Sequence, residues 1–301
     1  MDITHNAVHI ILAFSMPPLL LGVIAKTKAV FAGRVGPPVL QAYYDLAKLF
    51  RKGSVFSTTT TWVFRAGPVV GLVTAGLAVL LVPLVHDKTP IPFTGDFILL
   101  AYLFGLGRFF TASAALDTGS AFEGMGAARE VTFACLAEPA LFLGLLVLAK
   151  LSGSLSLATM LAKPDWVNAG ASLALVLLSW FIVLLAENSR IPFDDPNTHL
   201  ELTMIHEVMV LDHSGPALGM ILYGAALKFF VFGALIVRLA IPVATDYPWL
   251  DWPIFVGGML AVAVAVGVVE STMARLRLTH VPILLVAACL LSAFGIILLM
   301  R

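Results

Sequence analysis

Long apolar runs alternate with short polar connections along this chain. A membrane-spanning helix needs about 20 mostly apolar residues, and about eight runs reach that length. They are predicted at residues 5–25, 63–85, 96–117, 131–150, 166–186, 216–241, 253–271 and 281–300. We therefore expect an all-α integral membrane protein with a single transmembrane domain over residues 1–301.

Residues 37–52 show a different pattern, in which apolar side chains recur on one helical face and charged side chains occupy the rest. Pro37 and Pro38 suit the start of a helix, and Gly53 suits its end. The segment is too short and too charged to span, so we expect an amphipathic helix at the cytoplasmic interface. It would serve either as a lipid anchor or as a docking surface for a partner. The charged docking candidates are Arg34, Asp45 and Lys48.

The composition, 60% hydrophobic and 12% charged with a mean hydropathy of +0.99, leaves too little polar surface to coat a soluble globule. Eighteen Lys and Arg balance 18 Asp and Glu, so net charge gives no indication of nucleic-acid binding. Most of the basic residues lie on one side of the predicted spans, which places both termini outside and the 187–215 connection in the cytoplasm. The first apolar run lacks a basic leader and is expected to be a retained span.

An acidic loop over residues 187–215 separates the fifth and sixth predicted spans and holds a third of the chain's 18 acids. Ionised groups at such a depth are costly unless they are paired or hydrated. Their pKa values are open to upward shifts, which suits a proton relay, although a solvated loop is the alternative. Pro192 and Pro196 interrupt helix, and Asn197 or Thr198 is predicted to cap a helix that runs to about Leu211.

Three histidines recur every seven residues in this loop, at His199, His206 and His213. On a helix, neighbours at that spacing share a face but stand about 10 Å apart along the axis. They cannot jointly bind one metal ion, and proton exchange near neutral pH suits them better.

Charged residues also fall inside the apolar runs. Glu138 lies two turns inside a predicted span, followed by Pro139, and an intramembrane carboxylate is a functional candidate. Arg108 and Lys228 are embedded too, so each is expected to face the bundle interior and a carboxylate or water. For Arg108 a snorkelling side chain is the alternative.

Several of these motifs together resemble a known family. Residues 186–196, 201–202 and 212–215 resemble the long cytoplasmic loop of the complex I subunit that joins the membrane arm to the peripheral arm. Arg129 followed by Glu138-Pro139, the 33–37 turn and the 275–277 connection match the same family in the same order. The resemblance covers nearly the whole chain.

One branch of that family is more similar than the rest. Residues 195–216 and 38–49 are similar to the membrane-anchor subunit of group 4 membrane-bound nickel–iron hydrogenases, of the hydrogenase-4 and formate hydrogenlyase type. That anchor is homologous to subunit 1 of complex I. Asp212 and His213 stand where the quinone-reducing branch usually has Glu and Tyr.

The resemblance implies a membrane anchor that carries large catalytic and small iron–sulfur subunits and leads protons towards antiporter-like membrane subunits. No redox cofactor, metal or catalytic residue is expected in this chain. The partners would carry iron–sulfur clusters, and whether they keep a nickel–iron centre is left open. The proton-path candidates are Glu138, Glu187, Asp194, Glu201, Asp212 and Lys228. The candidates for counter-charge or docking in and near the loop are Arg129, Arg190, His206 and His213.

Two other functions remain open. The first is a quinone-site subunit of complex I, with the head group held between the first span, the amphipathic helix and the acidic loop. The second is an independent secondary transporter, which would move ions without partner subunits.

Overall fold

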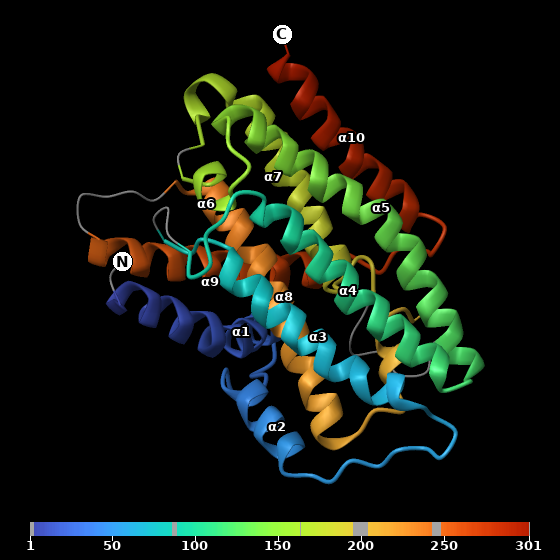
Figure 1. Ribbon diagram of the computed structural model, residues 1–301. Helices are drawn as coiled ribbons and strands as arrows, with labels where there is room; N and C mark the ends of the chain where they lie inside the picture. Colours follow the sequence, from blue (N-terminus) through green and yellow to red (C-terminus); the bar gives the residue numbers. More distant parts are fainter. Residues whose placement is uncertain (1–2, 86–88, 163, 195–203, 243–247, 301) are drawn as a thin grey trace.

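A computed structural model describes residues 3–85, 89–162, 164–194, 204–242 and 248–300, and all regular structure within them is helical (Figure 1). The elements are α1 (Ile3–Phe31), α2 (Gln41–Phe50), α3 (Trp62–Leu81), α4 (Asp96–Asp117), α5 (Ala121–Ser152), α6 (Leu157–Met160), α7 (Trp166–Glu187), the 3-10 turn η1 (Glu207–Val210), α8 (Gly215–Ala240), α9 (Pro248–Thr272) and α10 (Val281–Leu299).

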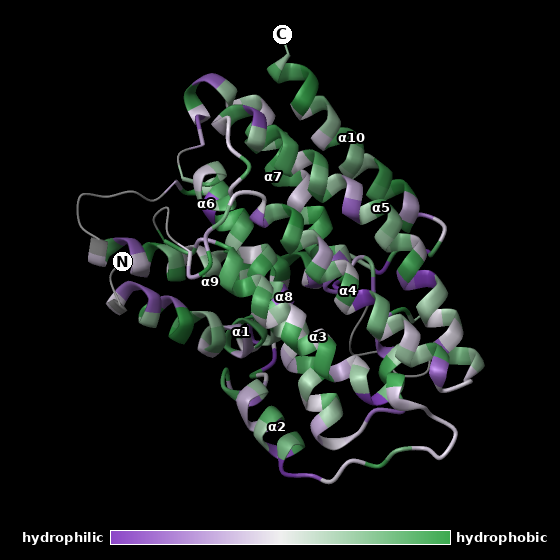
Figure 2. Ribbon diagram, in the orientation of Figure 1, coloured by the Kyte–Doolittle hydropathy of each residue, from purple (hydrophilic) through white to green (hydrophobic). Residues whose placement is uncertain are grey.

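Eight helices in the described residues are long and apolar enough to cross a membrane, which confirms the predicted fold class. Apolar residues cover most of their length (Figure 2). The largest difference from the prediction is at α5, which begins at Ala121 and not near residue 131. The first turns of α5 are polar, but they form helix because they pack against the end of the bundle that carries the acidic loop, where Glu123 and Ala127 are buried. We call this end the loop end.

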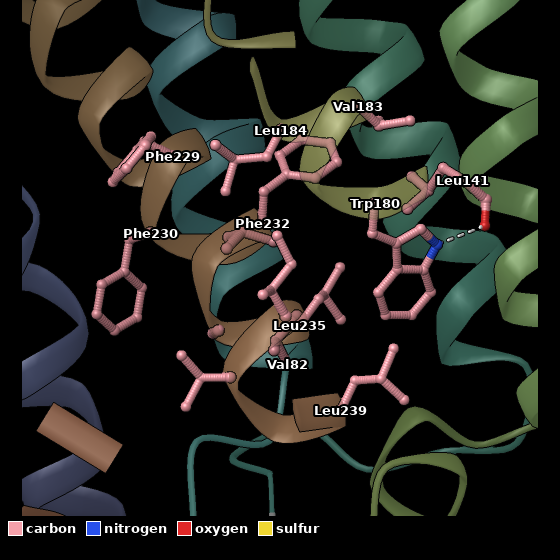
Figure 3. Close-up of a cluster of buried hydrophobic side chains, with 14 of the residues drawn as sticks. Val82, Leu141, Trp180, Val183, Leu184, Phe229, Phe230, Phe232, Leu235 and Leu239 are labelled. Atoms are coloured by element: carbon pink, nitrogen blue, oxygen red, sulfur yellow. Dashed lines mark hydrogen bonds between the residues drawn. The ribbon is translucent and has the colours of Figure 1, made fainter. Parts of the chain in front are cut away.

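The bundle is built around α8, which packs against α1, α2, α3, α7 and α9. Side chains of α8 such as Phe232 and Leu235 lie beside Trp180 and Leu184 of α7 (Figure 3). Lipid tails are as apolar as these side chains, so close packing and interhelical hydrogen bonds hold membrane helices together. The Trp180 indole N–H, for example, donates to the Leu141 carbonyl of α5 over 3.4 Å.

The amphipathic helix is present but shorter than predicted. It begins at Gln41 and not at residue 37, because the chain turns at Pro38, whose carbonyl accepts the Gln41 N–H. None of its side chains is fully buried. Tyr43 fixes it to α1 by donating its hydroxyl hydrogen to the Ser15 carbonyl. Phe50, an apolar residue at the end of this helix, is 48% exposed.

The acidic loop folds inward in its described part. The predicted helix up to about Leu211 is wrong there, because only Glu207–Val210 form a short 3-10 turn. Side-chain bonds to the backbone compete with helix: the Asp194 carboxylate accepts the N–H groups of Ile205 and His206 at 3.0 and 3.2 Å. His206 and His213 therefore do not share a helical face, and His199 lies outside the described residues.

Close contact between α5 and η1 requires a glycine at residue 126. A Cβ added to Gly126 would lie 2.2 Å from Val208 Cγ1 and 2.9 Å from the Ile205 carbonyl oxygen. Gly126→Ala should therefore lower stability by about 1–3 kcal/mol through overpacking. The matched control is Gly105→Ala in α4, where a Cβ would meet nothing within 4 Å. Thermal unfolding of the purified protein measures both, and equal melting temperatures for the two variants would contradict this packing.

Candidate functional site

A cluster of charged side chains lies inside the bundle at the point where α4, α5, α7 and α8 meet. Two nitrogens of Arg108 on α4 face different acids: Nη2 donates to both oxygens of Glu187 on α7, at 2.6 and 2.8 Å, and Nη1 donates to Glu138 on α5. Arg108 Nε lies 3.7 Å from Glu130 of α5. Lys228 Nζ of α8 lies 2.7 Å from Glu187. We call these five residues the ionic cluster.

Pairing makes the burial of this cluster tolerable. The side chain of Glu187 is 5% exposed and that of Arg108 is 10% exposed. A charge in an apolar interior is strongly destabilising unless a partner of opposite sign compensates it. Glu187 has two such partners, and its hydrogen bonds with Arg108 are charge-assisted, which makes them stronger than bonds between neutral groups. Arg108 therefore faces the bundle interior, as predicted, and is not a snorkelling side chain.

A second set of ion pairs fastens the acidic loop to the connection between α9 and α10. Arg275 Nη2 lies 2.8 Å from Asp194, and the Leu276 N–H donates to the Pro192 carbonyl at 2.9 Å. At the end of α9, the buried Glu270 binds Lys28 at 2.8 Å and Arg190 at 3.3 Å. The 275–277 connection thus holds the loop in place as well as carrying positive charge.

Two cavities lie against these charged residues. The larger, about 470 Å³, lies between α1, α2, α8 and the acidic loop, and its wall includes Asp45, Arg190 and His213. The smaller, about 110 Å³, lies beside the ionic cluster and is lined by Arg108 and Lys228 among others. Among the described residues, no group of three or more His, Cys, Asp or Glu side chains is placed to hold a metal ion.

The two described histidines of the loop are neutral bases at neutral pH. Burial lowers the pKa of His213 to about 4, and its ring stacks on Phe64 with centroids 4.0 Å apart. Burial also lowers the pKa of His206, against opposing contributions from nearby carboxylates. Neither ring therefore supplies a standing positive charge near pH 7, and a role of His206 and His213 as counter-charge or docking residues stays a prediction.

The structure brings together only some of the predicted proton-path residues. Glu138, Glu187 and Lys228 meet in the ionic cluster. Asp194 belongs to the separate pair with Arg275. Asp212 is exposed, and its N–H donates to the Glu123 carboxylate. Glu201 lies outside the described residues.

The predicted counter-charges have other partners. Arg190 pairs with Glu270, and Arg129 donates to the Met204 carbonyl at 2.9 Å. Arg108, Lys228 and Arg275 are the cations that pair with the described proton-path acids Glu138, Glu187 and Asp194. Of the predicted docking residues, Arg34, Asp45 and Lys48 are all exposed.

Three acids of the site did not emerge as candidates from the sequence. Glu130 lies eight residues before Glu138, which places both on one face of α5, so its spacing was a usable signal. Glu123 and Glu270 lie near span ends, where an acid is usually solvated, yet they are 1% and 5% exposed. Only their tertiary contacts reveal that they are buried.

The fold and the site define a class: a polytopic membrane protein that keeps paired acids and bases inside a helical bundle. A family model described as NADH dehydrogenase matches residues 5–301. The chain is 32% identical to formate hydrogenlyase subunit 4 of Escherichia coli K12 over 296 residues, covering 94% of each chain. It is 35% identical to hydrogenase-4 component C of the same organism over 234 residues, which is 77% of this chain and 73% of that one.

More distant relatives extend the group. NADH-ubiquinone oxidoreductase chain 1 of Triticum aestivum is 26% identical over 254 residues, 78% of each chain. A chain in the structure of the membrane-bound sulfane sulfur reductase, an archaeal respiratory membrane complex, has the same fold, with a TM-score of 0.84 at 21% identity and 98% coverage of both chains. The chain belongs to the NADH dehydrogenase family, and the resemblance seen in its motifs is confirmed.

Loss of the Arg108 guanidinium should destabilise the bundle strongly. Arg108→Met leaves Glu138 without its ion-pair partner and Glu187 with Lys228 alone, so we expect a loss of about 3–5 kcal/mol. Arg65→Met, at an exposed position of α3, is the control. Adding Glu138→Gln to Arg108→Met should recover part of the loss, because it removes the charge that the first substitution leaves without a partner. Additive losses in thermal unfolding would show that the two side chains do not interact.

The lowered pKa of His213 predicts a loss of stability in acid. The unfolded chain binds a proton near pH 6.5 and the folded chain only near pH 4, so the stabilisation present above pH 6.5 is lost as pH falls towards 4. The loss should reach about 3 kcal/mol. His213→Phe, which keeps the stack on Phe64, should flatten this part of the pH–stability curve, whereas the exposed His280→Phe should not. Parallel curves for wild type and His213→Phe would contradict the assignment.

Proposed function

We propose that this chain is the membrane-anchoring and proton-coupling subunit of a complex-I-like membrane-bound hydrogenase of the formate hydrogenlyase type. It docks a peripheral redox arm and links electron transfer there to translocation of protons or other ions. The relatives named formate hydrogenlyase subunit 4 and hydrogenase-4 component C support this assignment. The redox centres are iron–sulfur clusters, with or without a nickel–iron centre, in the partner subunits.

The ionic cluster is the observation that carries the proposal. Its three carboxylates, Glu130, Glu138 and Glu187, face the two cations Arg108 and Lys228. In a low-dielectric interior a surplus negative charge favours the binding of a proton. Three ionised carboxylates and two cations leave one surplus negative charge, and one bound proton neutralises it. The cluster can therefore gain and lose one proton between two states of low net charge. A change in charge at a nearby redox partner shifts that equilibrium, which is the coupling step.

The position of Glu138 indicates where the proton goes next. Its side chain is 41% exposed although it lies in the middle of a spanning helix. A carboxylate facing lipid is costly, so this side of α5 suits a neighbouring membrane subunit or water. An antiporter-like subunit placed there would receive the proton.

The proposed function also requires a surface on which the redox arm docks. The loop end of the bundle is suited to this role. The end of α2 and the connection after it carry exposed apolar side chains there, namely Phe50 at 48% and Val55 at 76% exposure. Basic residues such as Lys48 and Arg51 gather at the same end. The positive-inside rule supports a cytoplasmic orientation of this end, and we propose that the protein lies in the cell's inner membrane with the acidic loop on the cytoplasmic side.

Glu187→Gln tests the proposal. In the assembled complex, reconstituted into vesicles, we expect proton translocation per electron to fall at least about tenfold, because the cluster loses its surplus negative charge and with it the affinity for the exchanged proton. Gln keeps the size of Glu187 and one acceptor oxygen for Arg108 and Lys228, and translocation is compared only in preparations with full subunit content. Asp165→Asn, at the exposed N-cap of the same helix, is the matched control, because Asn caps as well as Asp. Wild-type translocation in an assembled Glu187→Gln complex would refute the proposal.

A quinone-site subunit is the second candidate, and the 470 Å³ cavity favours it. Apolar side chains such as Leu218 and Phe229 make up much of its wall, a suitable environment for a hydrophobic ring with a polar edge. If a quinone binds there, Leu218→Trp should abolish quinone-dependent activity and the exposed Leu290→Trp on α10 should not. A purified chain that moves ions alone in vesicles would instead support an independent transporter.

A further inference from the structure

The two cavities share a wall. Asn188, Ser189 and His206 line both the 470 Å³ cavity at α2 and the 110 Å³ cavity at the ionic cluster. The larger cavity reaches Asp45 of the amphipathic helix, and the smaller reaches Glu130 and Glu187. A proton that moves between the loop end and the ionic cluster by way of these cavities has to cross this wall.

His206 is the titratable member of the wall. Its backbone N–H is held by the Asp194 carboxylate at 3.2 Å, and Arg275 holds Asp194 in turn. The charged groups that act on its imidazole come from the surrounding elements and are Glu130 of α5, Glu187 of α7, Asp194 of the loop and Lys228 of α8. The ring is neutral near pH 7, so one nitrogen can accept a proton while the other gives one up.

Asn188, in the same wall as His206, has a buried polar atom without a protein partner. Its Nδ2 donates to the Leu184 carbonyl at 2.8 Å, which fixes the amide, while its Oδ1 is buried with no hydrogen bond. Buried polar atoms of this kind are normally satisfied by ordered water. A cavity of about 110 Å³ holds a few water molecules, since each occupies about 30 Å³ in the liquid.

We propose that His206, with water held by Asn188, is the proton relay across this wall. This rests on the proposed function and adds the entry route to it. One imidazole nitrogen takes a proton from water in the larger cavity, and the other releases a proton to the water at Asn188 Oδ1. That water passes it to a carboxylate of the ionic cluster, Glu187 or Glu130. Each proton taken up is matched by one released, and rotation of the ring restores the starting tautomer.

The alternative is that His206 only packs the loop, and replacement by residues of different chemistry separates the two. His206→Gln keeps the size and hydrogen bonding of the ring but cannot relay a proton. In the assembled complex, reconstituted into vesicles, we expect it to translocate protons about tenfold slower or less, with unchanged subunit content. His280→Gln, at an exposed site before α10, is the matched control and should behave as wild type.

Added imidazole gives a readout that a packing role would not affect. His206→Ala should be slow, and imidazole in the buffer should restore part of its rate with a pH profile that follows the free imidazole. A slow His206→Ala complex that imidazole does not restore would overturn the relay. Where a His206 variant fails to assemble, Asn188→Leu serves instead, and wild-type translocation in that variant would overturn it equally.

The relay and the proposed function fail in distinguishable ways. Wild-type translocation in His206→Gln together with loss in Glu187→Gln would refute the relay and leave the coupling function standing. Wild-type translocation in both would refute both. Loss in both variants, with retained electron transfer in the redox arm, is the expected result.

Discussion

The structure depends on one guanidinium group. Arg108 lies in an apolar bundle, where its charge is tolerable only because carboxylates surround it, and those carboxylates in turn need Arg108 and Lys228. Four helices are therefore joined by charge as well as by packing. Because the buried charges compensate one another, a change in the charge of one group alters the free energy of burying each of the others.

The same constraint explains the shape of the acidic loop. A loop this acidic would be solvated if it had no partners, but Arg275 and the backbone N–H groups that Asp194 accepts draw it onto the bundle. That folding closes the space between α2 and α8 into a cavity and brings His206 next to the ionic cluster. The proposed proton chemistry inside the bundle and the proposed route to it from the loop end thus depend on the same set of ion pairs.

Apolar run length was sufficient to predict the spans, because a membrane helix must satisfy its backbone internally and must be apolar over a fixed length. The start of α5 and the 3-10 turn at Glu207–Val210 depend on tertiary contacts, so periodicity could not reveal them. The residues of the site were predicted from the cost of placing a charge in an apolar span, which makes Glu138 and Lys228 improbable there without a compensating partner. The partner of Arg190 could not be predicted, because Glu270 lies on a distant helix and no sequence spacing connects the two residues.

The arrangement of the ionic cluster also bears on how the chain is made. Arg108 is synthesised before its partners on α5, α7 and α8, so α4 reaches the insertion machinery with an unneutralised cation in its interior. Such a residue costs about 2.5–3.5 kcal/mol at the centre of a helix during insertion. The acids of α5 come next in the chain, and they are the earliest groups that can relieve this cost. The order of these charges therefore favours insertion of α4 and α5 together, as a hairpin.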